Sequence, residues 1–197
     1  MLSGCRPLTD EEIEKVKECF EGRYVLRDKA LFIVGLKTGY RISELLSLRV
    51  RDVLGPKGEI ADYVTVERRN VKKKTQGRTV PLHPEAKEAL RAWLDEMERR
   101  GLLKPDVPVF LSQKKGEIRP LDKRSAWRIL KNAFRKAGLS GKLATHTLRK
   151  TFARKVHEAL GRDLFATQIA LGHKNIATTV RYLSPSVEII NQAILRV

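Results

Sequence analysis

The chain has 197 residues, of which 40 are Lys or Arg and 23 are Asp or Glu, so its formal net charge is +17. An excess of this size favours a polyanionic partner, DNA or RNA, because cationic side chains release the counterions that condense on nucleic acid. The sequence contains no run of about 18 apolar residues, which excludes a membrane-spanning helix, and we expect a soluble cytoplasmic protein. Cys5 and Cys19 lack the spacing of a zinc site, and we interpret them as reduced thiols.

The first part of the chain predicts helices joined by short turns. Thr9 begins a capping-box pattern, which predicts a helix over residues 9–20. Asp28 is predicted to cap a second helix, and Gly39 is a natural left-handed terminator for it. Another short helix follows, so we expect Arg41 to lie at a joint between two helices.

The middle of the chain predicts a small β-hairpin followed by a long helix. Residues 59–71 have the β-branched and aromatic content of a strand, residues 72–77 form a lysine-rich tip, and residues 78–82 form a second strand. Pro84 suits the first turn of an amphipathic helix that ends at Gly101.

The next segment is predicted to be a loop over residues 102–120, after which Asp122 can cap a helix over residues 123–138. One face of this helix is a basic strip. Either it is an ordinary solvated face or, as the net charge favours, it contacts phosphates. The predicted DNA-binding residues of this strip are Lys123, Arg124, Arg128 and Lys131.

A stretch that reads ATHTLRKTFARKVHEAL, residues 144–160, predicts another helix, with Thr145 as its cap. His146 and Arg149 are three residues apart on one face, so both can reach a single group near the helix N-terminus, where the helix dipole also favours an anion. The apolar side chains repeat every four residues and predict a buried stripe of Leu148, Phe152, Val156 and Leu160.

The segment over residues 163–183 predicts a helix closed by Gly172, then His173, then a helix that Asn175 can cap and that carries Tyr182 near its end. Taken singly, a His is usually structural and a Tyr usually packs in the core. Their ordered spacing with the preceding groups favours a functional interpretation. We expect the second helix to be anchored by Ile176, Val180 and Leu183.

Three stretches together resemble the signature boxes of the tyrosine recombinase family, which includes phage integrases and Xer-type recombinases. They read TGYRISELLSL, HTLRKTFA and LGHKNIATTVRYL, in the family's order and at about its spacing. The resemblance implies a mainly α-helical fold with a small antiparallel β-sheet, in the α+β class. We expect residues 1–183 to form one catalytic domain and residues 184–197 a C-terminal tail, with the family's N-terminal core-binding domain absent.

The resemblance also implies roles for the residues in the boxes. Tyr182 would attack a phosphodiester of double-stranded DNA and form a 3′-phosphotyrosyl bond, with no metal or other cofactor. Arg41 and Arg149 would bind the non-bridging oxygens through their planar, permanently charged forks. His146 would assist proton transfer at the tyrosine or hold the phosphate, and His173 would donate a hydrogen bond to a phosphate oxygen.

The general acid of the family is a Lys in the hairpin turn. Lys74 fits the family's KT pattern, whereas counting back from Pro81 selects Lys73. We assign the role to Lys74 and expect phosphate contact or simple solvation for Lys73 and Lys72.

Three functions agree with these observations. The first is a site-specific recombinase that acts on DNA as a tetramer, whose tail docks on a neighbouring protomer or packs on its own domain. The second is a type IB topoisomerase-like enzyme, and the third is a non-catalytic DNA-binding module. The amino-acid sequences of the boxes favour the recombinase. A recombinase would be associated with the nucleoid.

Overall fold

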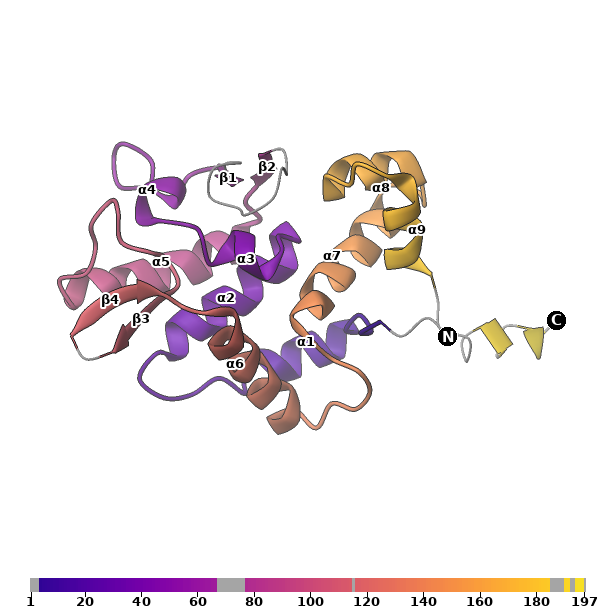
Figure 1. Cartoon of the computed structure of the whole chain (residues 1–197), viewed down its shortest axis with the longest axis horizontal. Coiled ribbons are helices and arrows are strands. Elements are labelled where there is room, and N and C mark those ends of the chain that lie inside the picture. The colour runs from indigo at the N-terminus through magenta and orange to yellow at the C-terminus, as the bar shows by residue number, and fades with distance from the viewer. Residues whose placement is uncertain (1–3, 67–76, 115, 185–189, 192–193, 197) are drawn as a thin grey trace.

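The computed structural model describes residues 4–66, 77–114, 116–184, 190–191 and 194–196 (Figure 1). Within this part of the chain the fold is mainly helical, with two small antiparallel sheets, as the sequence predicts. No helix in these ranges is both long and apolar enough to cross a bilayer. In chain order the elements are α1 (Asp10–Lys17), α2 (Val25–Thr38), α3 (Ile42–Leu45), α4 (Val50–Val53), β1 (Tyr63–Val66), β2 (Arg78–Pro81), α5 (Pro84–Arg99), β3 (Leu111–Lys114), β4 (Glu117–Pro120), α6 (Lys123–Lys136), α7 (Thr145–Ala159), α8 (Leu164–Leu171) and α9 (Ile176–Leu183).

The central helix of the core is α2, which packs against α5 on one side and α7 on the other. Phe32 of α2 and Trp93 of α5 are fully buried, and the Trp93 indole N–H donates to the carbonyl oxygen of Val109 at 2.7 Å. Figure 1 shows α7 between this core and the α8–α9 pair. The end of α2, the start of α7 and the end of α8 therefore meet in one region.

Most of the predicted helix ends are confirmed. Thr9 and Glu12 form the capping box of α1. Gly39 ends α2 at φ 60°, with its N–H donating to the carbonyl oxygen of Gly35. Asp122 accepts from the backbone N–H of Ser125 at 2.8 Å and so caps α6. In each case residues close in sequence complete the hydrogen bonds of the helix terminus. The local sequence pattern is therefore sufficient to predict where the helix begins or ends.

Two predicted caps are wrong. Helix α2 begins at Val25, one turn earlier than expected, and Asp28 is buried in its first turn, where it accepts a 2.8 Å hydrogen bond from Nε of Arg27. Thr145 is the first residue of α7, preceded by Ala144, whose N–H donates to the Thr147 hydroxyl at 3.0 Å. Asp28 serves a buried ion pair that local spacing does not reveal.

The sequence prediction also missed a hairpin within residues 102–120. Strands β3 and β4 pair antiparallel, with Leu111 opposite Pro120. Gly116, at φ 81°, supplies the left-handed turn that a short hairpin needs. Because β4 is exposed along its whole length, it lacks the alternating pattern that indicates a strand.

The apolar stripe predicted for α7 is only partly buried. Leu148 is buried, whereas Leu160 is 41% exposed; likewise Val180 of α9 is 44% exposed and does not anchor its helix. Polar residues occupy interior positions instead. Thr151 of α7 is buried, donating its hydroxyl to the Thr147 carbonyl oxygen and accepting from the Leu8 N–H. These groups are satisfied by backbone partners, so burying them is not penalised.

The predicted lysine-tipped hairpin is confirmed at its base. Strands β1 and β2 pair antiparallel, with Tyr63 opposite Pro81. Lys72, Lys73 and Lys74 lie outside the described residues.

Candidate active site

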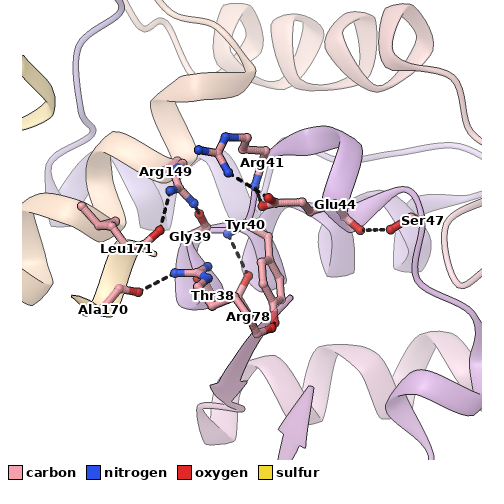
Figure 2. A network of polar contacts seen from close by, with 10 residues as sticks. All are labelled: Thr38, Gly39, Tyr40, Arg41, Glu44, Ser47, Arg78, Arg149, Ala170 and Leu171. Carbon is pink, nitrogen blue, oxygen red and sulfur yellow. Dashed lines mark hydrogen bonds and ion pairs between the residues drawn. The ribbon is translucent and has the colours of Figure 1, made fainter. Parts of the chain in front are cut away.

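Arg41 lies at the joint between α2 and α3, as the sequence predicts. Its Nη1 donates to Oε1 of Glu44 at 2.9 Å, and its backbone N–H donates to Oε2 of the same carboxylate at 2.6 Å (Figure 2). Glu44 therefore caps α3 and also orients the guanidinium of Arg41. The Arg41 side chain keeps about a third of its surface accessible, so it can also contact a bound group.

Arg149 projects from the first half of α7 and is 1% exposed. Its Nη1 donates to the carbonyl oxygen of Gly39 at 2.5 Å and its Nη2 to that of Leu171 at 2.6 Å. Its Nε is buried without a hydrogen-bond partner among the described residues. Burial, followed by the charges of Arg41 and Arg78, lowers the pKa of Arg149 to about 10, so it remains a cation at neutral pH.

Arg78 is a third guanidinium in this region, and the sequence prediction missed it. It donates to the carbonyl oxygens of Ala170 and Thr38, and its Cζ lies 4.6 Å from the centre of the Tyr40 ring. Figure 2 shows Arg41, Arg78 and Arg149 extending from different elements toward one region. The carbonyls at the ends of α2 and α8 carry partial negative charge, which stabilises the Arg78 and Arg149 cations, whereas Arg41 is paired with the Glu44 carboxylate.

His173 follows Gly172, which ends α8 at φ 61°. The imidazole is buried, its Nδ1 lies 3.0 Å from Oγ1 of Thr179, and its Nε2 has no partner in the described part of the chain. Burial, then the positive charges of Arg149, Arg41 and Arg78, lowers the pKa of His173 to about 4. The ring is therefore neutral at pH 7.

Tyr182 lies beside His173, in the last turn of α9. The centres of the two rings are 5.1 Å apart, with an interplanar angle of 54°, and Cζ of Arg149 lies 5.8 Å from the centre of the Tyr182 ring. Three of the side chains assigned to catalysis are thus in contact range although they come from α7, the α8–α9 turn and α9.

His146 lies in the first turn of α7, one turn before Arg149. Much of its surface is accessible. Partial loss of hydration, then the charges of Arg149, Arg41 and Lys150, lowers its pKa below the ordinary value. At pH 7 its ring is neutral and able to accept a proton.

A cavity of about 320 Å³ opens beside these groups, lined by side chains that include Arg41, Glu44, Arg78 and His173. Three guanidiniums lie in this region, and among the described residues that line the cavity Glu44 carries the one carboxylate. Two buried nitrogens, Nε of Arg149 and Nε2 of His173, have no protein partner within the described ranges. Because buried polar groups are almost always hydrogen-bonded, this arrangement is suited to an anion with several acceptor oxygens.

The remaining predicted residues stand apart from this cluster or cannot be placed. The basic strip is exposed on α6, as expected of a solvated or a DNA-binding face, and comprises Lys123, Arg124, Arg128 and Lys131. The three hairpin lysines are outside the described residues. Within the described ranges, no group of three or more His, Cys, Asp or Glu side chains could hold a metal ion.

The profile of the phage integrase family matches residues 6–188. The chain belongs to this family, the tyrosine recombinases. It is 34% identical over 157 residues to the tyrosine recombinase XerD of Corynebacterium glutamicum, covering 80% of this chain and 48% of that protein. It is 31% identical over 193 residues to XerA of Pyrococcus furiosus, covering 97% of this chain and 61% of that one.

Solved structures of tyrosine recombinases share the fold. The XerA recombinase matches with a TM-score of 0.74 at 25% identity, covering 96% of this chain and 64% of that one. XerH bound to difH after cleavage matches with a TM-score of 0.72 at 25% identity, covering 96% and 52%. The chain spans about half to three fifths of the length of the curated relatives it matches.

Proposed function

We propose that this chain is the catalytic part of a site-specific DNA recombinase, which cleaves and rejoins strands through a 3′-phosphotyrosyl bond at Tyr182. The observation that carries the proposal is a pair of buried nitrogens beside the tyrosine ring, on Arg149 and His173, which have no hydrogen-bond partner among the described residues. A phosphodiester supplies acceptor oxygens for both, and membership of the tyrosine recombinase family supports the reaction type.

In the proposed reaction the Tyr182 oxygen attacks phosphorus, and the bond from phosphorus to the 5′ oxygen breaks. The transition state spreads negative charge over the non-bridging oxygens. Arg149 and Arg41 would stabilise that charge, because they are held in place before the substrate arrives, by backbone carbonyls and by Glu44 respectively. The phosphoester bond energy is kept in the covalent intermediate, so rejoining needs no external energy source.

Two protons must move in this step. The tyrosine hydroxyl proton has to leave, and neutral His146 is suited to accept it. The departing 5′ oxygen has to gain a proton, and the family resemblance assigns this to Lys74. His173 would donate a hydrogen bond to a phosphate oxygen rather than transfer a proton, since its pKa is about 4.

We also propose that double-stranded DNA runs along the basic strip of α6. The four predicted side chains of the strip are exposed, and the chain carries a formal charge of +17. These contacts would position the duplex without reading its sequence.

The tail is the proposed means of assembly into a tetramer. In its described residues, Ile190, Ile194 and Leu195 are 42%, 65% and 86% exposed. Apolar side chains left in water at a terminus favour docking on a neighbouring protomer over packing on the same domain. Sedimentation on DNA of the whole chain, and of a chain truncated after Ser184, tests this: assembly should require the tail, and identical assembly would contradict it.

Covalent trapping tests the proposed function. The full-length gene product is incubated with nicked suicide duplexes from the DNA that flanks its gene, and denaturant-resistant complexes are separated. We expect an adduct with the wild type and with Tyr63→Phe, which removes an exposed hydroxyl from β1, and none with Tyr182→Phe. Binding without any adduct would indicate a non-catalytic module. Relaxation of plasmids without strand exchange would indicate a topoisomerase.

A further inference from the structure

Thr179 is the only fully buried residue of α9, and its hydroxyl oxygen lies 3.0 Å from Nδ1 of His173. We propose that Thr179 is a positioning residue that holds His173 in the tautomer carrying its hydrogen on Nε2. The chemistry of His173 rests on the proposed function, but the tautomer itself does not.

The Thr179 hydroxyl differs from other hydroxyl groups on or at the ends of the helices. Those of Thr38, Thr151, Thr167 and Ser184 each donate to the backbone carbonyl four residues earlier, at 2.6 to 2.8 Å. Thr179 makes no such bond among the contacts of the described residues. Its hydroxyl hydrogen is therefore available to the imidazole.

The number of hydrogens shared by the two groups indicates the same tautomer. A neutral imidazole has one N–H and one bare nitrogen. If Nδ1 carried the hydrogen, the Thr179 hydroxyl hydrogen would be buried with no acceptor from the described residues, because Thr179 is 0% exposed. If Thr179 donates to a bare Nδ1, both groups are satisfied. The hydrogen of His173 then lies on Nε2.

A second His–Thr pair, between α7 and α8, gives an internal comparison. Nδ1 of His157 lies 3.0 Å from the hydroxyl of Thr167, the same separation as in the His173 pair. Here, however, the hydroxyl already donates to the carbonyl oxygen of Asp163 at 2.6 Å. Nδ1 of His157 must then be the donor. The same distance therefore implies opposite tautomers for the two rings.

The Nε2–H tautomer matters because Nε2 is the ring nitrogen that has no partner in the described part of the protein. With a hydrogen there, neutral His173 can donate to a non-bridging phosphate oxygen, whereas a bare Nε2 would repel it. The backbone of His173 is also held, by Nε2 of Gln168, which donates to its carbonyl oxygen at 2.9 Å. Among the described residues, the charges of Arg149, Arg41 and Arg78 act on the ring, and the Tyr182 ring lies against it.

Nitrogen NMR tests the tautomer without any need for activity. Two-bond ¹⁵N–¹H correlation spectra of the ¹⁵N-histidine-labelled protein are recorded at pH 8.5, where imidazoles are neutral. The His173 signals are identified by their loss in His173→Gln. We expect the Nε2–H pattern for His173 and the Nδ1–H pattern for His157. An Nδ1–H pattern for His173 would overturn the proposal.

The variants test whether Thr179 is the cause. Thr179→Val should shift the ring nitrogen signals of His173, because Nδ1 loses its hydrogen bond, whereas Thr179→Ser should restore them. Thr178→Val makes the same chemical change one position away on α9 and should leave them unchanged. If the His173 signals in Thr179→Val are identical to those of the wild type, Thr179 does not determine the tautomer of His173.

Cleavage measures the functional consequence. In single-turnover reactions on suicide duplexes, Thr179→Val should slow cleavage about tenfold, the loss of roughly one hydrogen bond, with unchanged DNA affinity. Thr179→Ser should recover most of the rate. A Thr179→Val rate equal to that of the wild type would contradict the role of Thr179 in positioning. If the wild type itself fails to cleave, the proposed function fails, and the NMR result still decides the tautomer.

Discussion

Arg149 shows how a single residue type suits the proposed chemistry. Its guanidinium makes two hydrogen bonds to backbone carbonyls and still has a buried Nε–H. A Lys has one point charge and cannot reproduce this fork. Arg149→Lys should therefore slow single-turnover cleavage about 100-fold while changing DNA affinity little, since the charge is kept. Arg99→Lys, on the exposed last turn of α5, is the control. Equal cleavage rates for Arg149→Lys and the wild type would contradict a role for Arg149 in stabilising the transition state.

His173 makes a prediction about pH and stability. Its pKa falls from an ordinary 6.5 to about 4 in the folded chain, because it is buried among cations. Below pH 6.5 the unfolded chain therefore binds a proton that the folded chain does not, and the free energy of unfolding decreases as the pH falls from 6.5 toward 4. Between pH 7 and pH 5.5 the wild type should lose about 1 kcal/mol more than His173→Gln. Urea unfolding at both pH values measures this, and equal losses would contradict it.

At this scale the sequence predicts the residues of the site better than their partners. The positions of Arg41, Arg149, His173 and Tyr182 follow from spacing, and the structure brings them together. The contributions of Arg78 and Thr179 could not be predicted. Both depend on contacts between elements, with the Thr38 and Ala170 carbonyls and with the His173 ring respectively.

Among the elements, the end of α2 positions the site most directly, because Gly39 supplies both the left-handed turn and a carbonyl for Arg149. A Cβ at Gly39 would also overlap the ring of Phe152, whereas Gly101, at φ +67°, has open space around it. Gly101→Ala should cost about 1 kcal/mol from backbone strain. Gly39→Ala should cost roughly 2 to 4 kcal/mol, since overpacking adds to the strain. Urea unfolding compares the free energies of unfolding of the two variants. Equal losses would show that local movement relieves the overlap with the Phe152 ring.

Element boundaries were predictable where neighbouring residues complete a helix end, as at Thr9, Gly39 and Asp122. They were not predictable where contacts with a distant segment determine the boundary. Asp28 is buried with Arg27, whose Nη1 in turn donates to the carbonyl oxygen of Leu111. The exposed strand β4 carries no pattern that distinguishes it from a loop.

For the whole molecule, the net charge predicts salt-sensitive DNA binding. Each cation that contacts a phosphate adds about 0.9 to the slope of log affinity against log salt. Arg128→Gln removes an exposed charge from the basic strip of α6, and Arg99→Gln removes one from α5. Binding titrations over a salt series should show a slope smaller by about 0.9 for the first variant only. Equal slopes would place the DNA away from α6.

Mapping the covalent adduct shows which residue is joined to DNA in the intermediate. The trapped wild-type complex is digested with trypsin and nuclease, and the modified peptide is sequenced by mass spectrometry. We expect a nucleotide attached through its 3′ phosphate to the peptide that carries Tyr182. Attachment at Tyr24, Tyr40, Tyr63 or a serine would contradict the assignment of Tyr182 as the nucleophile.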